Sequence, residues 1–98
     1  MELTMDKNGN ELFAAFKGEL DAQTSPDVEA QIVSALDGVE KLVLDFAQLE
    51  YISSAGLRVL LTIMQIMIER QGVTVRNVSD DIMRVLDMTG FAGDLNFE

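Results

Sequence analysis

Hydrophobic and polar residues alternate at the start of the chain in a way that predicts a β-hairpin. Residues 1–5 alternate between the two classes, which is typical of a strand with one exposed face. Asn8-Gly9 is a strong signal for a tight turn, and residues 12–17 then form a second strand. Residues 18–24 are mostly polar, so we expect them to form a loop that leaves the sheet.

Two amphipathic helices are predicted from apolar positions spaced three and four residues apart. The first opens at Ser25-Pro26, because serine is favoured at the N-cap and proline at the first helical position, and it stops near Gly38. Another begins after Ser79 and ends at Gly90. Their expected inner faces are Val28, Ile32, Val33 and Leu36 for the first, and Ile82, Val85 and Leu86 for the other.

The helix predicted between these two, over residues 57–69, is much more apolar. Its polar side chains fall on one narrow stripe, formed by Arg58, Thr62, Gln65 and Glu69. A helix of this kind is either buried on most sides or covers a sheet and also meets a partner. Met64 and Met67 suit an irregular core or a binding surface, and we favour the core.

The remaining apolar runs predict further strands. Residues 41–46 suit a central parallel strand that is buried on both faces, followed by a connection over residues 47–52. Residues 73–78 are rich in β-branched side chains, and residues 95–97 form a short edge strand or cover the core. We therefore expect one α/β domain over residues 1–98, of order β-β-α-β-α-β-α(-β), with a mixed sheet of four to five strands.

Composition and charge narrow the function. The 98 residues include 17 acidic and 7 basic side chains, a net charge of −10. This charge disfavours nucleic acids and anionic membranes and favours a basic protein partner, or it simply keeps the protein soluble. The N-terminal residues are largely polar and the apolar helix is too short to span a bilayer, so we expect a cytoplasmic protein without membrane insertion.

Histidine and cysteine are both absent from the sequence, which removes the usual general base and the usual metal ligands. A serine hydrolase would need an activating base, and Lys7, Lys17 and Lys41 are far apart in the chain. We therefore expect a protein that is not an enzyme and that binds neither a metal nor a cofactor.

The only concentrated chemistry lies in the turn that precedes the apolar helix. Ser53 and Ser54 stand where this helix begins, so either can cap it. The unpaired N–H groups of a helix N-terminus could also donate hydrogen bonds to an attached phosphoryl group. If the strands over residues 12–17 and 41–46 are parallel neighbours, their following loops open at one edge of the sheet. Asp21 and Thr24 would then lie near the two serines.

Four segments together resemble the STAS domain family, and most closely its small, free-standing bacterial anti-sigma factor antagonists. They are Gly18-Glu19-Leu20-Asp21, Leu44-Asp45-Phe46, Ile52-Ser53-Ser54-Ala55-Gly56-Leu57 and Asp87-Met88-Thr89-Gly90-Phe91. The resemblance implies a partner switch in transcription regulation. The unmodified antagonist binds an anti-sigma factor that is also an ATP-dependent serine kinase, and so frees a sigma factor. Phosphorylation of one serine dissociates the complex, and a phosphatase resets it.

Position by position, the resemblance points to Ser54 as the phosphorylated residue. The family's turn reads Asp-Ser-Ser-Gly or Asp-Ser-Thr-Gly, and alignment on Gly56 places Ser54 at the acceptor. Ser53 then replaces the usual aspartate and is an alternative acceptor, while Asp21 matches a loop aspartate at the partner interface. The expected partner-binding residues are Asp21, Thr24, Ser53, Ser54, Gly56 and Arg58. The same fold also allows a non-catalytic scaffold subunit of a lipid-transport or stress-sensing assembly.

Overall fold

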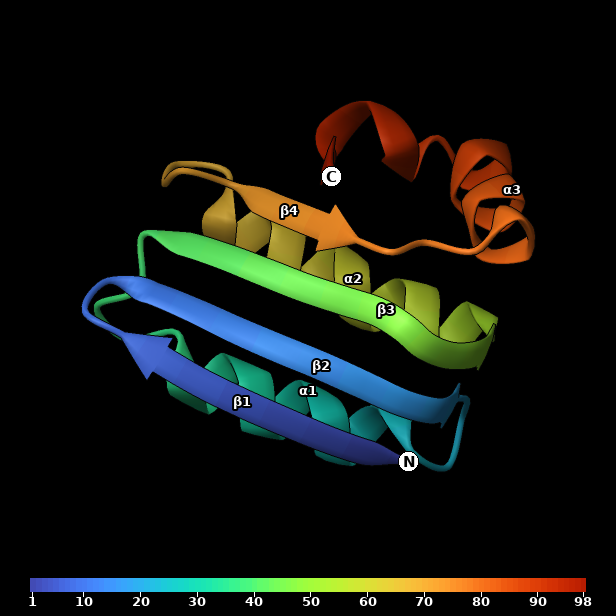
Figure 1. Cartoon of the computed structure of the whole chain (residues 1–98), viewed down its shortest axis with the longest axis horizontal. Coiled ribbons are helices and arrows are strands. Elements are labelled where there is room, and N and C mark those ends of the chain that lie inside the picture. Colours follow the sequence, from blue (N-terminus) through green and yellow to red (C-terminus); the bar gives the residue numbers. More distant parts are fainter.

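A computed structural model describes all residues, 1–98, and forms one five-stranded mixed sheet with helices (Figure 1). Along the chain lie β1 (Glu2–Asn8), β2 (Glu11–Leu20), α1 (Ser25–Ala35), β3 (Lys41–Ile52), α2 (Ser54–Met67), β4 (Val73–Arg76), α3 (Asp80–Thr89), the 3-10 helix η1 (Phe91–Asp94) and β5 (Asn96–Phe97). The strands lie in the order β1-β2-β3-β4-β5; β1 and β2 are antiparallel, and the other neighbours are parallel. The predicted element order is confirmed, including the final edge strand.

The two longest strands extend beyond the limits predicted for them. Residues 18–20 belong to β2 and residues 47–52 belong to β3, where a loop and a connection were expected. The two extensions pair with each other, with irregular register between Ala15 and Lys17 and between Gly18 and Glu19. The pairing provides hydrogen-bond partners for backbone N–H and C=O groups in this stretch. The irregular register also explains why apolar and polar residues do not alternate here as in an ordinary strand.

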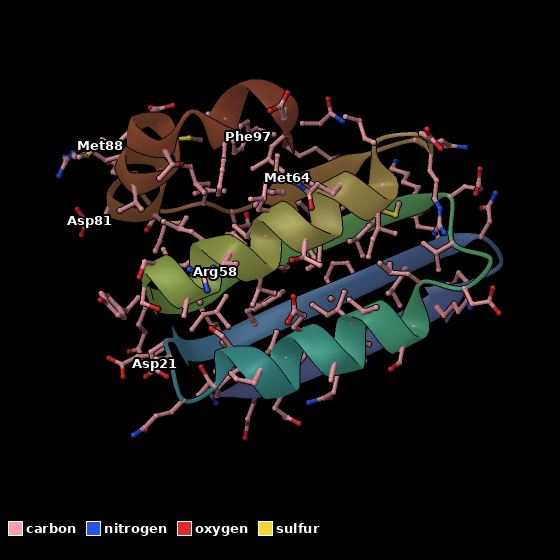
Figure 2. The ribbon with its side chains drawn as sticks, turned by 180° about the vertical axis from the view of Figure 1, so that it is seen from behind. Asp21, Arg58, Met64, Asp81, Met88 and Phe97 are labelled. Carbon is pink, nitrogen blue, oxygen red and sulfur yellow. The ribbon has the colours of Figure 1, made fainter.

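Helices α1 and α2 cover one face of the sheet, while α3 and η1 lie beyond β4, on the side where β5 forms the edge (Figures 1 and 2). The opposite face carries no helix, yet Val43 near the start of the central strand β3 is fully buried there. It lies between Phe13 and Thr74 on the neighbouring strands, and the Arg76 guanidinium is 5.9 Å from the centre of the Phe13 ring. The predicted burial of β3 on both faces is confirmed, but side chains of the sheet itself cover the second face.

The main core lies between the sheet and the two helices. Phe16 of β2 meets Phe46 of β3 edge to face, with ring centroids 5.2 Å apart. Met64 and Met67 of α2 are buried, so the predicted core role of the methionines is confirmed. Val33 was expected on the inner face of α1 but is 38% exposed. The helix buries the narrower face that Val28, Ile32 and Leu36 form at four-residue spacing.

The starts of the helices agree only partly with the predicted caps. Ser79 caps α3, since its side chain accepts the Ile82 N–H at 3.2 Å, and Gly90 ends that helix in a left-handed conformation with φ of 81°. Ser25 does not cap α1 as expected. It is the first helical residue, because its N–H already bonds to the Asp21 carbonyl, and its hydroxyl is buried without a partner.

Arg70, just beyond the C-terminal end of α2, ties that end to the region after α1. Its guanidinium donates to the carbonyl groups of Leu36 and Val39, at 2.8 Å each. The two helices are therefore connected by charge-assisted hydrogen bonds at the end away from the serine turn.

None of the helices combines the length and the apolar character needed to cross a membrane.

Candidate functional site

The ends of β2 and β3 meet at one edge of the sheet and bring the two predicted loops together. Leu20 pairs with Ile52, and the N–H of Ser53 donates to the Leu20 carbonyl at 2.9 Å. Asp21 and Ser53 are the next residues of the two strands, so they leave the sheet side by side. The expectation that both loops open at the same edge is confirmed, and Figure 2 shows Asp21 and Arg58 at this end of the molecule.

A tight turn after β2 holds the carboxylate of Asp21. Its Oδ1 accepts the backbone N–H groups of Gln23 at 2.9 Å and Thr24 at 3.0 Å, and it lies 3.2 Å from the Thr24 hydroxyl. That hydroxyl accepts the Asp21 N–H at 3.0 Å and lies 2.9 Å from the Glu19 carbonyl. All three contacts to the carboxylate involve Oδ1, and its second oxygen has no hydrogen-bond partner within the chain.

The same hydrogen bonds lower the pKa of the Asp21 carboxyl group below that of an ordinary aspartate. The backbone N–H of Thr24 contributes most, and the N–H of Gln23 and the Thr24 hydroxyl add to it, while partial burial acts in the opposite direction. A carboxyl group with a lowered pKa is ionised at neutral pH. Asp21 therefore places a fixed negative charge beside the serine turn.

The two serines of the turn have different environments. Ser53 is the N-cap of α2 and is half-buried, and its Oγ accepts the Gly56 N–H at 3.3 Å. Ser54 is the first residue of the helix, and its side chain is exposed and forms no hydrogen bond within the chain. Of the two candidate caps, the structure assigns the role to Ser53, which leaves the hydroxyl of Ser54 free.

Gly56 lies on the inner side of the turn. A Cβ at this position would be 2.8 Å from Ile52 Cγ1, 2.8 Å from the Leu20 carbonyl oxygen and 2.9 Å from Leu20 Cγ. The expectation that Gly56 contacts a partner is therefore corrected, because the residue is buried against the ends of β2 and β3. Its role is to let the serine turn approach the two strands closely.

A cavity of about 200 Å³ separates the N-terminal ends of α1 and α2. It is lined by Ala22, Ser25, Pro26, Glu29, Ala55, Arg58 and Val59. Figure 2 shows Arg58 on the part of α2 that faces the start of α1. Ser25 also lines this cavity, although its unpaired hydroxyl oxygen is buried.

The structure adds two residues to the predicted site. Glu29 lines the cavity together with Arg58, because α1 starts only four residues after the Asp21 turn and packs beside α2. Tyr51 is 51% exposed immediately before the serine turn. The buried residues at the end of β3 are Phe46, Leu49 and Ile52, at three-residue spacing, and Tyr51 falls between two of them and points outward. This apolar spacing is visible in the sequence and could have indicated that Tyr51 is exposed.

The fold and this site place the chain in a known family. The family model described as the STAS domain matches residues 2–98, so the chain belongs to the STAS family. It is 36% identical over 93 residues to BtrV of Bordetella bronchiseptica, which is named as an anti-sigma factor antagonist, with 93% of this chain and 80% of BtrV covered. The anti-sigma F factor antagonist of Paenibacillus polymyxa is 30% identical over 93 residues, covering 92% and 80% of the two chains.

Solved structures agree with this assignment at the level of the fold. The Bacillus anti-sigma factor antagonist SpoIIAA in its unphosphorylated form superposes with a TM-score of 0.85 at 19% identity, covering 99% of this chain and 88% of SpoIIAA. Its phosphorylated form gives a TM-score of 0.78 at the same identity, covering 99% and 91%. The predicted antagonist-like STAS fold is therefore confirmed.

Proposed function

We propose that this protein is an anti-sigma factor antagonist that is switched off by phosphorylation of Ser54. In the unmodified state it binds an anti-sigma factor with serine kinase activity and so releases a sigma factor. The observation that carries the proposal is the contrast between the two serines: Ser53 is engaged as the helix cap, whereas Ser54 is exposed and free beside Asp21. The names of the two relatives support the antagonist role.

The protein itself needs no catalytic residue for this switch, which fits the absence of histidine and cysteine from the sequence. The Ser54 hydroxyl oxygen attacks the γ-phosphorus of ATP held by the partner, and an O–P bond forms. The bond from the γ-phosphorus to its bridging oxygen breaks, ADP leaves, and the serine proton passes to a base of the kinase. A phosphatase would hydrolyse the new ester and restore the hydroxyl.

Phosphorylation would disrupt binding mainly through charge. It adds about −1.5 to −2 charge units next to the ionised carboxylate of Asp21. A partner that covers this edge would have to remove the phosphoryl dianion from water, which is costly. A loss of about 2 to 3 kcal/mol would weaken binding about 30- to 140-fold. The fold should survive, since the group sits on the first residue of α2, where a negative charge is favourable.

The decisive experiment combines a candidate anti-sigma factor kinase with ATP and follows intact mass and binding. We expect a gain of about 80 Da in the parent protein and none in Ser54→Ala, with Ser53→Ala as the matched control that still gains one phosphoryl group. Ser54→Ala should stay bound to the kinase in the presence of ATP, and Ser54→Asp should bind weakly.

Two outcomes would contradict the proposal. If Ser54→Ala gains the phosphoryl group and Ser53→Ala does not, the acceptor is Ser53. If the parent protein neither binds nor is modified by any anti-sigma factor kinase encoded in its own genome, and is instead recovered within a large assembly, it acts as a scaffold subunit.

A further inference from the structure

Arg58 lies one helical turn after Ser54. Residues four apart on a helix have Cβ atoms about 5–6 Å apart on the same side of the helix, within reach of an ion pair. Both side chains are exposed, and both belong to the regular helix α2. A phosphoryl group attached to Ser54 would extend toward solvent in front of the Arg58 guanidinium.

Arg58 is also available, unlike most cations of this protein. The three ion pairs engage Lys17, Arg76 and Arg84. Lys7 and Arg70 donate to backbone carbonyl groups. The Arg58 guanidinium forms no ion pair or hydrogen bond, although Glu29 lines the same cavity. Lys41 is the other free cation, but it begins β3 and lies at the opposite edge of the sheet.

Apart from Arg58, the charged side chains around Ser54 are acidic, and the N-terminal amino group is close enough to Asp21 to help lower the pKa of its carboxyl group. Asp21 is ionised at the same edge, the exposed carboxylate of Glu50 lies near the end of β3, and the whole chain carries a charge of −10. A dianion added here would meet repulsion from these carboxylates, and Arg58 is the one basic side chain nearby that could offset it, in addition to the N–H groups at the start of α2. The guanidinium can also bind phosphate oxygens through two parallel hydrogen bonds, which lysine cannot do.

We propose that Arg58 is the intramolecular partner of phosphorylated Ser54, and that phosphorylation thereby withdraws a positive charge from the binding surface. This inference rests on the proposed function, because it concerns the same modification. The switch then has two parts. The phosphoryl group introduces negative charge, and its pairing with Arg58 takes away a cation that the unmodified protein offers to its partner.

The same geometry explains a preference for Ser54 over Ser53. Four residues beyond Ser53 stands Leu57, which cannot neutralise a phosphoryl group. Phosphorylation of Ser53 would also disturb the cap that accepts the Gly56 N–H. Arg58 is therefore a positioning residue that acts on the modified side chain, and it has no part in transferring the phosphoryl group.

The test uses the full-length protein with phosphoserine incorporated at position 54 during synthesis, so that no kinase is required. The second ionisation of phosphoserine is followed by 31P NMR at low salt. A neighbouring cation favours the dianion and lowers this pKa. We expect Arg58→Gln to raise it by about 0.15–0.4 unit, as the usual strength of a pair at this spacing implies. Arg58→Lys should restore part of the difference.

Arg84→Gln is the matched control, since Arg84 is exposed on another helix and pairs with Asp81. It should leave the phosphoserine pKa unchanged. Circular dichroism verifies that each variant is folded. An equal pKa in the parent and in Arg58→Gln would overturn the inference, and so would an equal rise in the Arg84→Gln control. Neither result would affect the kinase and binding experiments that test the proposed switch.

Discussion

Replacement of Gly56 by alanine tests whether the serine turn depends on close contact with the strand ends. The added methyl carbon would come within 2.8 Å of the Leu20 carbonyl oxygen and of Ile52 Cγ1, and within 2.9 Å of Leu20 Cγ. Real Cβ atoms essentially never approach other atoms to less than 3.0 Å. The turn must therefore move away from β2 or the strand ends must shift.

The size of the effect follows from three contributions. Overpacking of a filled site costs about 1–3 kcal/mol. The same shift strains the bond from the Ser53 N–H to the Leu20 carbonyl, which is worth about 1 kcal/mol. Alanine stabilises a helix interior by about 1 kcal/mol relative to glycine, and this offsets part of the loss. We expect a net destabilisation of about 2 kcal/mol and a fall in Tm of about 8–16 °C for a domain of this size.

Urea denaturation and calorimetry measure this difference directly. Gly93→Ala is the control, because a Cβ there meets nothing within 4 Å and the residue does not have a left-handed backbone. It should leave stability nearly unchanged. Gly56→Ala should also slow phosphorylation of Ser54, since the hydroxyl moves with the turn. A Gly56→Ala protein as stable as the parent would refute the argument that the turn is held by close packing.

Three further predictions concern the surroundings of the turn. Ser53→Ala should destabilise the protein by about 0.5–2 kcal/mol through loss of the helix cap, whereas Ser54→Ala should change stability by less than about 0.5 kcal/mol in urea denaturation; equal effects would contradict the assignment of the cap. Because the Asp21 pKa is lowered in the folded state, its contribution to stability is complete above the unfolded pKa of about 3.9 and is lost as the pH falls through the folded value. Asp21→Asn should reduce the dependence of stability on acidic pH. NMR titration of Thr24→Val should show a higher Asp21 pKa than in the parent, because the hydroxyl is lost. An unchanged Asp21 pKa would count against a contribution of the Thr24 hydroxyl. Arg70→Met should cost about 2 kcal/mol by leaving two carbonyl groups without their charged donor, yet the rate of Ser54 phosphorylation measured on folded protein should not change.

The order of elements could be read from the sequence because each element carries its own local signal. Asn8-Gly9 marks the hairpin, Ser79 and Gly90 mark the ends of α3, and the apolar residues of α2 recur at helical spacing. The proximity of Asp21 to the serine turn could also be predicted, but only with the further assumption that β2 and β3 are parallel neighbours.

The extents of β2 and β3 could not be predicted in this way. The residues at the end of β3 are buried every third position, at Phe46, Leu49 and Ile52, because the pairing with β2 is irregular. An alternating pattern is therefore absent, and only the partner strand reveals that the segment is extended. The choice between Ser53 and Ser54 as the cap likewise depends on the backbone angles at the turn, which both serines could adopt.

The second face of the sheet shows a similar limit. A near-continuous apolar run in β3 predicted burial on both sides, which is usually provided by helices. Here no helix covers Val43, which lies between Phe13 and Thr74 of the neighbouring strands, and Arg76 packs on the Phe13 ring. The sequence predicts that Val43 is buried, but it does not predict which side chains bury it.

The two hydrogen bonds of Arg70 restrain the movement of helix α2 relative to the sheet. They fix α2 at one terminus, while Ser54 stands at the other, a distance of about 21 Å for a 14-residue helix. If this helix slid along the sheet, both hydrogen bonds would break. We therefore expect that a modification at residue 54 would not move α2, because the movement would cost the free energy of these bonds. The modified and unmodified proteins should then have the same backbone conformation. A partner would distinguish them only by direct contact with residue 54 and its surroundings.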